Sequence, residues 1–170
     1  MKALTRAYDV LLQALAVCAG GVIFIAFVMI VVDVTIRILG FAPPAFTIAV
    51  VEYILLYYAM FAAPWLVRKK GHVYIDAVTH LLPPVVKTIT AKFAYLVSIC
   101  SSLVFCYFST GLLIESYQNG VLDVRGVDLP QWLLYLPMPL SFGLVAIEFG
   151  RYLVGIDDYY VERTEVKEAM

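Results

Sequence analysis

The sequence predicts an all-α integral membrane protein that crosses the bilayer four times. Four long stretches contain no charged residue and consist mostly of apolar side chains; they cover residues 10–32, 53–67, 93–114 and 129–147. A helix rises about 1.5 Å per residue, so about 20 residues cross a hydrocarbon core of roughly 30 Å. The composition supports this prediction, because 63% of the residues are hydrophobic and only 15% are charged.

The chain is expected to form a single membrane domain over residues 1–170, since no stretch is long enough for a separate soluble domain. The predicted spans cover about 8–39, 45–68, 84–115 and 129–154. The first span is longer than the bilayer requires, so we expect this helix to tilt or protrude. It ends at Gly40–Pro44, because proline cannot continue a helix and also restricts the residue before it.

A short amphipathic helix is expected between the second and third spans, over about 72–82. Its apolar residues recur at helical spacing, whereas His72 and Asp76 lie on the opposite, polar side. The segment is too short to cross a bilayer, so we expect it to lie in the membrane interface. Two prolines, Pro83 and Pro84, end it.

The start and the middle of the last span have identifiable signals. Asp128 is well placed to cap the helix, and Pro130 fits its first turn. Trp132 has the amphipathic ring that settles at headgroup depth. Pro137 and Pro139 lie inside the span, where they should kink the helix and free backbone carbonyls that a neighbouring helix must accommodate.

Lysine and arginine are distributed unevenly between the two sides of the membrane. Ten of the twelve fall on one side: Lys2, Arg6, Arg68, Lys69, Lys70, Lys87, Lys92, Arg151, Arg163 and Lys167. The other side holds only Arg37 and Arg125. Positive charge is retained in the cytoplasm, so we expect both termini, including the tail 156–170, to be cytoplasmic.

Charged residues inside spans are costly and therefore need partners. Asp33 and Arg37 are four residues apart on one helix face, and Glu52 lies at a similar depth in the second span. We expect an Arg37–Glu52 bridge, with Asp33 as a second acceptor. The alternative is that Asp33 or Glu52 binds a coupling cation or proton, which the neighbouring Arg37 disfavours. Glu148 and Arg151 can also pair, at i,i+3 spacing.

The sequence predicts no catalytic residue, metal site or cofactor. His72, Asp76 and His80 are spaced four apart, but one carboxylate and two imidazoles make a weak metal site, so a hydrated face is favoured. Neither histidine lies in a span, which removes a membrane-embedded base or haem ligand. A net charge of −1 argues against nucleic acid as a partner.

The order of the motifs resembles a known family over roughly residues 5–155. The motifs are Asp33-x3-Arg37, Glu52-Tyr53, Arg68-x3-His72-Val73-x2-Asp76, Leu82-Pro83, Leu129-Pro130-x-Trp132, Pro137-x-Pro139 and Arg151. Together with the four spans, they resemble the small (Q-type, DctQ-like) membrane subunit of tripartite ATP-independent periplasmic (TRAP) transporters. The family-like positions are Arg37, Glu52, His72, Asp76, Pro130 and Trp132.

The resemblance implies a multi-pass protein of the bacterial inner membrane with two protein partners. A large permease subunit would carry the substrate and sodium sites and move its transport domain like an elevator. A periplasmic binding protein would deliver an organic acid, and this chain would serve as a non-catalytic scaffold surrounded by membrane lipids. Two other hypotheses remain, namely a self-sufficient four-helix homodimeric exporter and a membrane enzyme or redox subunit.

Overall fold

The computed structural model describes residues 2–69, 84–124 and 128–155, which form two long helical hairpins. The first hairpin consists of α1 (Lys2–Ile38) and α2 (Phe46–Arg68). The second consists of α4 (Pro84–Asn119) and, in the returning direction, α5 (Trp132–Tyr135) and α6 (Pro137–Val154). The prediction of four long apolar helices is confirmed. The expected interfacial helix over 72–82 and the tail 156–170 lie outside the described residues.

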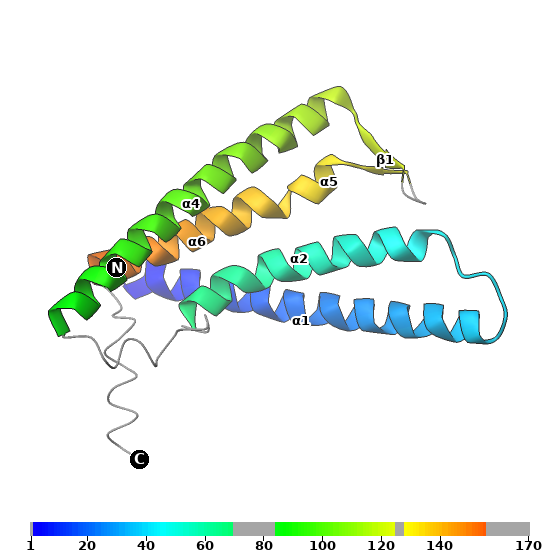
Figure 1. Ribbon diagram of the computed structural model, residues 1–170, viewed down its shortest axis with the longest axis horizontal. Helices are drawn as coiled ribbons and strands as arrows, with labels where there is room; N and C mark the ends of the chain where they lie inside the picture. The colour runs from blue at the N-terminus through cyan, green and yellow to red at the C-terminus, as the bar shows by residue number, and fades with distance from the viewer. Residues whose placement is uncertain (1, 70–83, 125–127, 156–170) are drawn as a thin grey trace, which may run out of the picture.

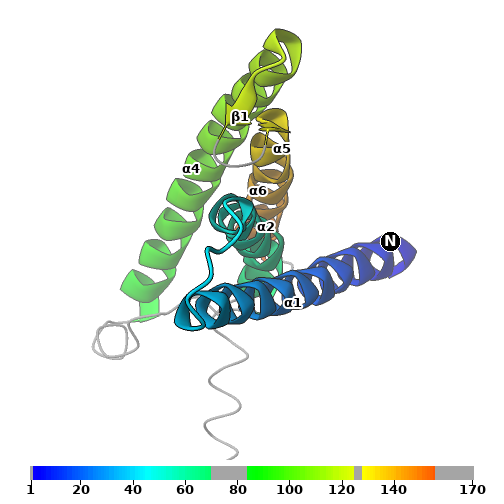
Figure 2. The same ribbon diagram turned by 90° about the vertical axis from the view of Figure 1, so that its right-hand side faces the viewer.

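The long helices lie side by side in the order α4, α6, α2, α1 (Figure 1). Figure 2 shows α1 and α4 on opposite sides of the central pair α2 and α6. The hairpins meet where α1 begins and where α2 and α6 end, which we call the Asp9 end. They diverge towards the Gly40 end, where the α1–α2 loop and two short strands lie (Figure 1). This row of helices leaves broad faces of α1 and α4 without a neighbour among the described residues.

The face of α1 that is buried against the rest of the chain repeats every seven residues. Leu12, Ala19 and Ala26 are almost completely buried, and small side chains such as alanine let helices approach closely. α1 has 37 residues, so at about 1.5 Å per residue it is longer than a bilayer core. The helix ends at Ile38 and is closed by Gly40, whose φ of 82° is left-handed, with hydrogen bonds from Gly40 N to Arg37 O and from Phe41 N to Ile36 O.

The outer faces of α1 and α4 are apolar and exposed. Large exposed side chains include Phe24 and Phe27 on α1, and Phe93 and Phe108 on α4. A Cβ placed on Gly20 or Gly21 of α1 meets no described atom within 4 Å. These faces are therefore available to lipid or to another subunit.

A β-hairpin precedes α5 and corrects the predicted start of the last span. β1 (Leu122–Val124) pairs antiparallel with β2 (Asp128–Pro130), with Leu122 opposite Pro130. Asp128 is therefore a strand residue rather than a helix cap, and α5 begins at Trp132 without a side-chain cap. The backbone N–H of Gln131 donates to Val121 O at 2.9 Å, so strand pairing satisfies backbone groups that a longer helix would have used.

The prolines of the last span interrupt it, as predicted. The helical hydrogen-bond pattern breaks at Leu136, between α5 and α6, directly before Pro137. Proline has no N–H to donate to the carbonyl four residues earlier, which is that of Leu133. The hydroxyl of Tyr57 on α2 donates to Leu133 O at 2.7 Å instead. A neighbouring helix thus supplies the hydrogen bond that the proline removes.

We expect Tyr57→Phe to lower the free energy of unfolding by about 1 kcal/mol, because it leaves the Leu133 carbonyl without this donor. The measurement is an SDS titration of the purified protein, followed by tryptophan fluorescence. Tyr58→Phe is the matched control, since the neighbouring Tyr58 is exposed. Equal stabilities of the two variants would contradict this role for Tyr57.

Candidate functional site: ion pairs at the two ends of the helices

Asp33 and Arg37 form an ion pair within α1, near the Gly40 end. Arg37 Nε lies 2.7 Å from Asp33 Oδ2, one helical turn away. The Arg37 side chain is 51% exposed, whereas that of Asp33 is only 13% exposed. Asp33 continues the seven-residue repeat of Leu12, Ala19 and Ala26, which explains why it is the more buried partner. Asp33 therefore accepts a hydrogen bond from Arg37, as predicted.

Glu52 lies on an exposed position of α2, in the half nearer the Gly40 end. The guanidinium of Arg37 is turned to Asp33 on its own helix, so the expected Arg37–Glu52 bridge stays a prediction. A double-mutant cycle with Arg37→Ala and Glu52→Gln would measure any coupling between them.

The predicted site residues Pro130 and Trp132 lie where the β-hairpin joins α5. Pro130 pairs with Leu122 across the two strands. The Trp132 ring meets that of Tyr117 on α4 edge to face, with centroids 6.0 Å apart. The hydroxyl of Tyr53 on α2 donates to Asp123 Oδ2 of β1 at 3.1 Å. Of these contacts, the one between Tyr53 and Asp123 links β1 to α2 of the first hairpin. The other two predicted site residues, His72 and Asp76, lie outside the described residues.

The Asp9 end holds a fully buried carboxylate between two arginines. Glu148 on α6 is 0% exposed. Its Oε1 lies 3.7 Å from Nη1 of Arg151, which confirms the predicted i,i+3 pair. Its Oε2 lies 3.5 Å from Nη1 of Arg68, the last residue of α2. An ionised carboxylate is costly to bury unless it is paired, so the two arginines explain how Glu148 can occupy this position.

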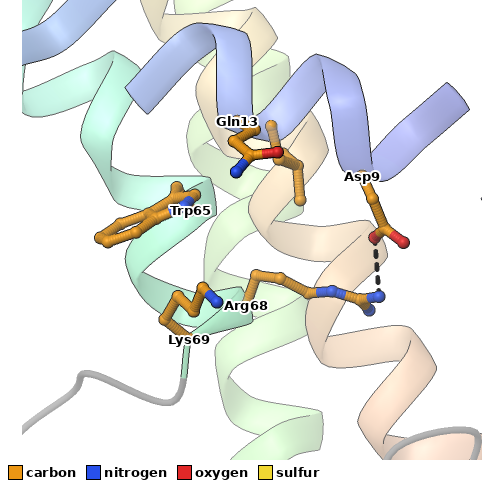
Figure 3. Close-up of a pocket in the computed structure, with 6 residues that line it drawn as sticks. Asp9, Gln13, Trp65, Arg68 and Lys69 are labelled. Carbon is orange, nitrogen blue, oxygen red and sulfur yellow. Dashed lines mark hydrogen bonds and ion pairs between the residues drawn. The ribbon is translucent and has the colours of Figure 1, made fainter. Parts of the chain in front are cut away.

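Arg68 also reaches α1 and so joins three helices. Its Nη2 lies 2.8 Å from Asp9 Oδ1, as Figure 3 shows. Arg151 adds a further link to α1, because its guanidinium carbon lies 5.5 Å from the centre of the Tyr8 ring, within cation–π distance. The cluster of Asp9, Arg68, Glu148 and Arg151 therefore ties α1, α2 and α6 together.

An aromatic core adjoins this ionic cluster. Tyr95 on α4 lies beside Phe149 and Tyr152 of α6, with ring centroids 6.4 and 5.9 Å away. The buried hydroxyl of Tyr152 donates to Val67 O at 2.8 Å and approaches Arg68 O at 3.3 Å. These carbonyls belong to the last turn of α2, where the supply of helical N–H donors runs out. Tyr152 therefore holds the end of α2 that presents Arg68 to Glu148.

The arrangement of these groups is suited to bracing helices rather than to chemistry. Among the described residues, no group of three or more His, Cys, Asp and Glu side chains could hold a metal ion. The two ion-pair clusters lie near opposite ends of the spans, and each of the acids Asp9, Asp33 and Glu148 has an arginine within 4 Å. Such pairing lowers the cost of the charges, and the Asp9–Arg68 and Arg68–Glu148 pairs also link α1, α2 and α6.

Sequence reasoning missed the contacts that Asp9 and Arg68 make between helices. In the sequence, Arg68 serves as one of the positive charges that orient the chain and as the first residue of a family-like motif, but neither role assigns it a partner. A usable signal was the parallel direction of the second and fourth spans, which both end on the same side of the membrane and so place Arg68 and Glu148 at a similar depth. The rotation that brings their side chains together follows from packing and is not visible in the spacing of the sequence.

The fold and these clusters define a helical, multi-pass membrane protein that braces its own helices with buried charge. The family model for the tripartite ATP-independent periplasmic transporters, DctQ component, matches residues 26–156. Because the match covers well over half of the chain, the chain belongs to this family of non-enzymatic transporter subunits. No curated protein sequence matches it. A tripartite transporter of this family also contains a DctM component and a periplasmic binding protein.

Proposed function

We propose that this chain is the static scaffold of a TRAP transporter in the bacterial inner membrane. Its large partner, the DctM component, would carry out sodium-gradient-driven uptake of an organic acid that the periplasmic binding protein delivers. The observation that carries this proposal is the match to the DctQ family over residues 26–156. The small subunit would enlarge and anchor the part of the complex that stays still.

The internal contacts of the chain support a scaffold role. The buried Glu148 is held by Arg68 and Arg151, and Asp33 by Arg37. A paired acid is a poor carrier for a sodium ion or a proton, because the neighbouring cation already stabilises its charge. The exposed apolar faces of α1 and α4 suit contact with lipid and with a second membrane protein rather than with water.

The proposed orientation places both termini, and therefore the Asp9 end, in the cytoplasm. Its support is the excess of lysine and arginine at that end.

In a cysteine-free background, we expect Val124→Cys in β1 to react with a membrane-impermeant maleimide in cells whose outer membrane has been opened. Val154→Cys at the end of α6 should react only after the inner membrane is permeabilised. Both side chains are 75% exposed, so they form a matched pair, and the reverse labelling pattern would contradict the orientation.

Reconstituted transport tests the function itself. Proteoliposomes that contain this chain and its DctM partner should accumulate the organic acid when the binding protein and an inward sodium gradient are supplied. Removal of this chain should abolish uptake, as should removal of the gradient.

Two results would overturn the proposal. One is full uptake by the large subunit without this chain. The other is transport by this chain alone, which would favour a self-sufficient exporter. If this chain transports alone, Glu52→Gln tests the role of that acid. Loss of transport would indicate that Glu52 cycles protons, and unchanged transport that it only contacts a neighbour.

A further inference from the structure

A pocket of about 280 Å³ lies between the first turns of α1 and the last turns of α2. Its lining consists of Asp9, Leu12, Gln13, Trp65, Arg68 and Lys69. Figure 3 shows Asp9 and Gln13 approaching from α1, with Trp65, Arg68 and Lys69 at the end of α2. Asp9 and Arg68 form the ion pair that links α1 to α2, whereas Gln13, Trp65 and Lys69 take no part in the ion pairs described above.

The polar groups of the pocket suit a phosphodiester. Arg68 is already paired with Asp9 and Glu148. Lys69 is exposed, and its ammonium makes no ion pair with the part of the chain that the structure describes. The side-chain amide of Gln13 and the indole N–H of Trp65 are neutral donors. One cation with two neutral donors matches one negatively charged phosphate group.

The position of the pocket indicates that the phosphate belongs to a lipid headgroup. The membrane-spanning stretches run from Arg6 in α1 and to Arg68 in α2, so the pocket lies where hydrocarbon gives way to headgroups. Tryptophan is enriched at that depth, and basic pockets between transmembrane helices bind lipid headgroups. The sequence neighbours Val10 and Leu66 are exposed and apolar, as a surface alongside acyl chains should be.

Asp9 selects among the headgroups. One of its carboxylate oxygens, Oδ1, accepts from Arg68, which leaves Oδ2 to accept from a second donor. A lipid whose headgroup carries a second negative charge, or offers only hydroxyl groups, would gain little binding energy from this carboxylate. A primary ammonium linked to the phosphate by two carbons can donate a charge-assisted hydrogen bond to it.

We propose that this pocket binds the headgroup of one phosphatidylethanolamine molecule. Lys69, Gln13 and Trp65 donate hydrogen bonds to the phosphate, and Asp9 accepts a hydrogen bond from the ammonium. The bound lipid fills the space between α1 and α2 and adds a contact between them beyond the Asp9–Arg68 pair. This inference goes beyond the scaffold role and does not depend on it.

Native mass spectrometry of the full-length chain tests the proposal. The protein is purified together with any subunit that remains bound, delipidated, and offered equal amounts of phosphatidylethanolamine, phosphatidylcholine and phosphatidylglycerol. We expect one phosphatidylethanolamine per chain to be retained over the other two lipids. Lys69→Gln should lower that affinity about tenfold, the usual effect of losing a hydrogen bond to a charged group. Lys92→Gln on α4, a lysine outside the pocket, should leave the affinity unchanged.

Two further variants separate the two halves of the headgroup. Gln13→Leu removes a donor to the phosphate without touching an ion pair, so it should weaken binding of phosphatidylethanolamine. Asp9→Asn should remove the preference for phosphatidylethanolamine over phosphatidylcholine, whose quaternary ammonium cannot donate. Tryptophan fluorescence establishes that each variant is folded.

Several outcomes would overturn the proposal. They are equal retention of all three lipids by the unaltered chain, tighter binding of phosphatidylglycerol, and equal effects of Lys69→Gln and Lys92→Gln. A lipid that binds the isolated chain but is excluded by the large subunit would also overturn it, because the pocket would then belong to the interface between subunits.

Discussion

Glu148→Gln is expected to lower the free energy of unfolding by about 3–5 kcal/mol, the usual cost of removing one partner from a buried ion pair. Glu148 is fully buried, and its two oxygens face Arg68 and Arg151 from different sides. The substitution keeps the shape of the side chain but removes the charge that both guanidinium groups share. The expected effect is large because the Glu148 carboxylate is fully buried, so its neutralisation leaves two guanidinium groups without this partner.

The measurement is an SDS titration of the purified protein, and Glu115→Gln is the control. Glu115 is an exposed acid on α4, so its neutralisation should change the free energy of unfolding by less than about 0.5 kcal/mol, as most surface substitutions do. The double variant Glu148→Gln with Arg151→Gln should lose less than the sum of the two single losses, because neither partner is then left alone. A loss from Glu148→Gln no larger than that from Glu115→Gln would show that the buried pairs contribute little.

The long helices were predictable because the membrane imposes a local rule. An apolar run of about 20 residues must be helical in lipid, whatever its neighbours are, so α1 and α4 follow from the charge-free stretches alone. α2 follows when the apolar residues on both sides of Glu52 are taken together. The Glu148–Arg151 pair was predictable for a similar reason, since i,i+3 spacing on one helix brings two side chains together without any tertiary information.

The contacts between helices could not be predicted in the same way. The Asp9–Arg68 and Arg68–Glu148 pairs depend on how α1, α2 and α6 are rotated against one another, which packing decides. The β-hairpin was missed because strands of three residues carry almost no periodicity. Asp128 and Pro130 suit the start of a helix equally well. At Pro137 the sequence indicated a freed carbonyl, but only the structure identifies Tyr57 as its donor.

Tyr152→Ala is expected to lower the free energy of unfolding by about 3–5 kcal/mol, as truncation of a buried aromatic side chain usually does. The Tyr152 ring fills the space beside Tyr95 and Phe149, and its hydroxyl holds the last carbonyls of α2. Tyr152→Phe separates the two contributions: it keeps the ring, so the loss should be about 1 kcal/mol from the missing hydrogen bond. Tyr107→Ala on α4 is the control, since that ring is 75% exposed. If all three variants unfolded at the same SDS concentration as the unaltered chain, the junction of α2, α4 and α6 would not limit stability. If Tyr152→Phe alone cost as much as Tyr152→Ala, the hydrogen bond to α2, rather than the packing of the ring, would hold Arg68 against Glu148.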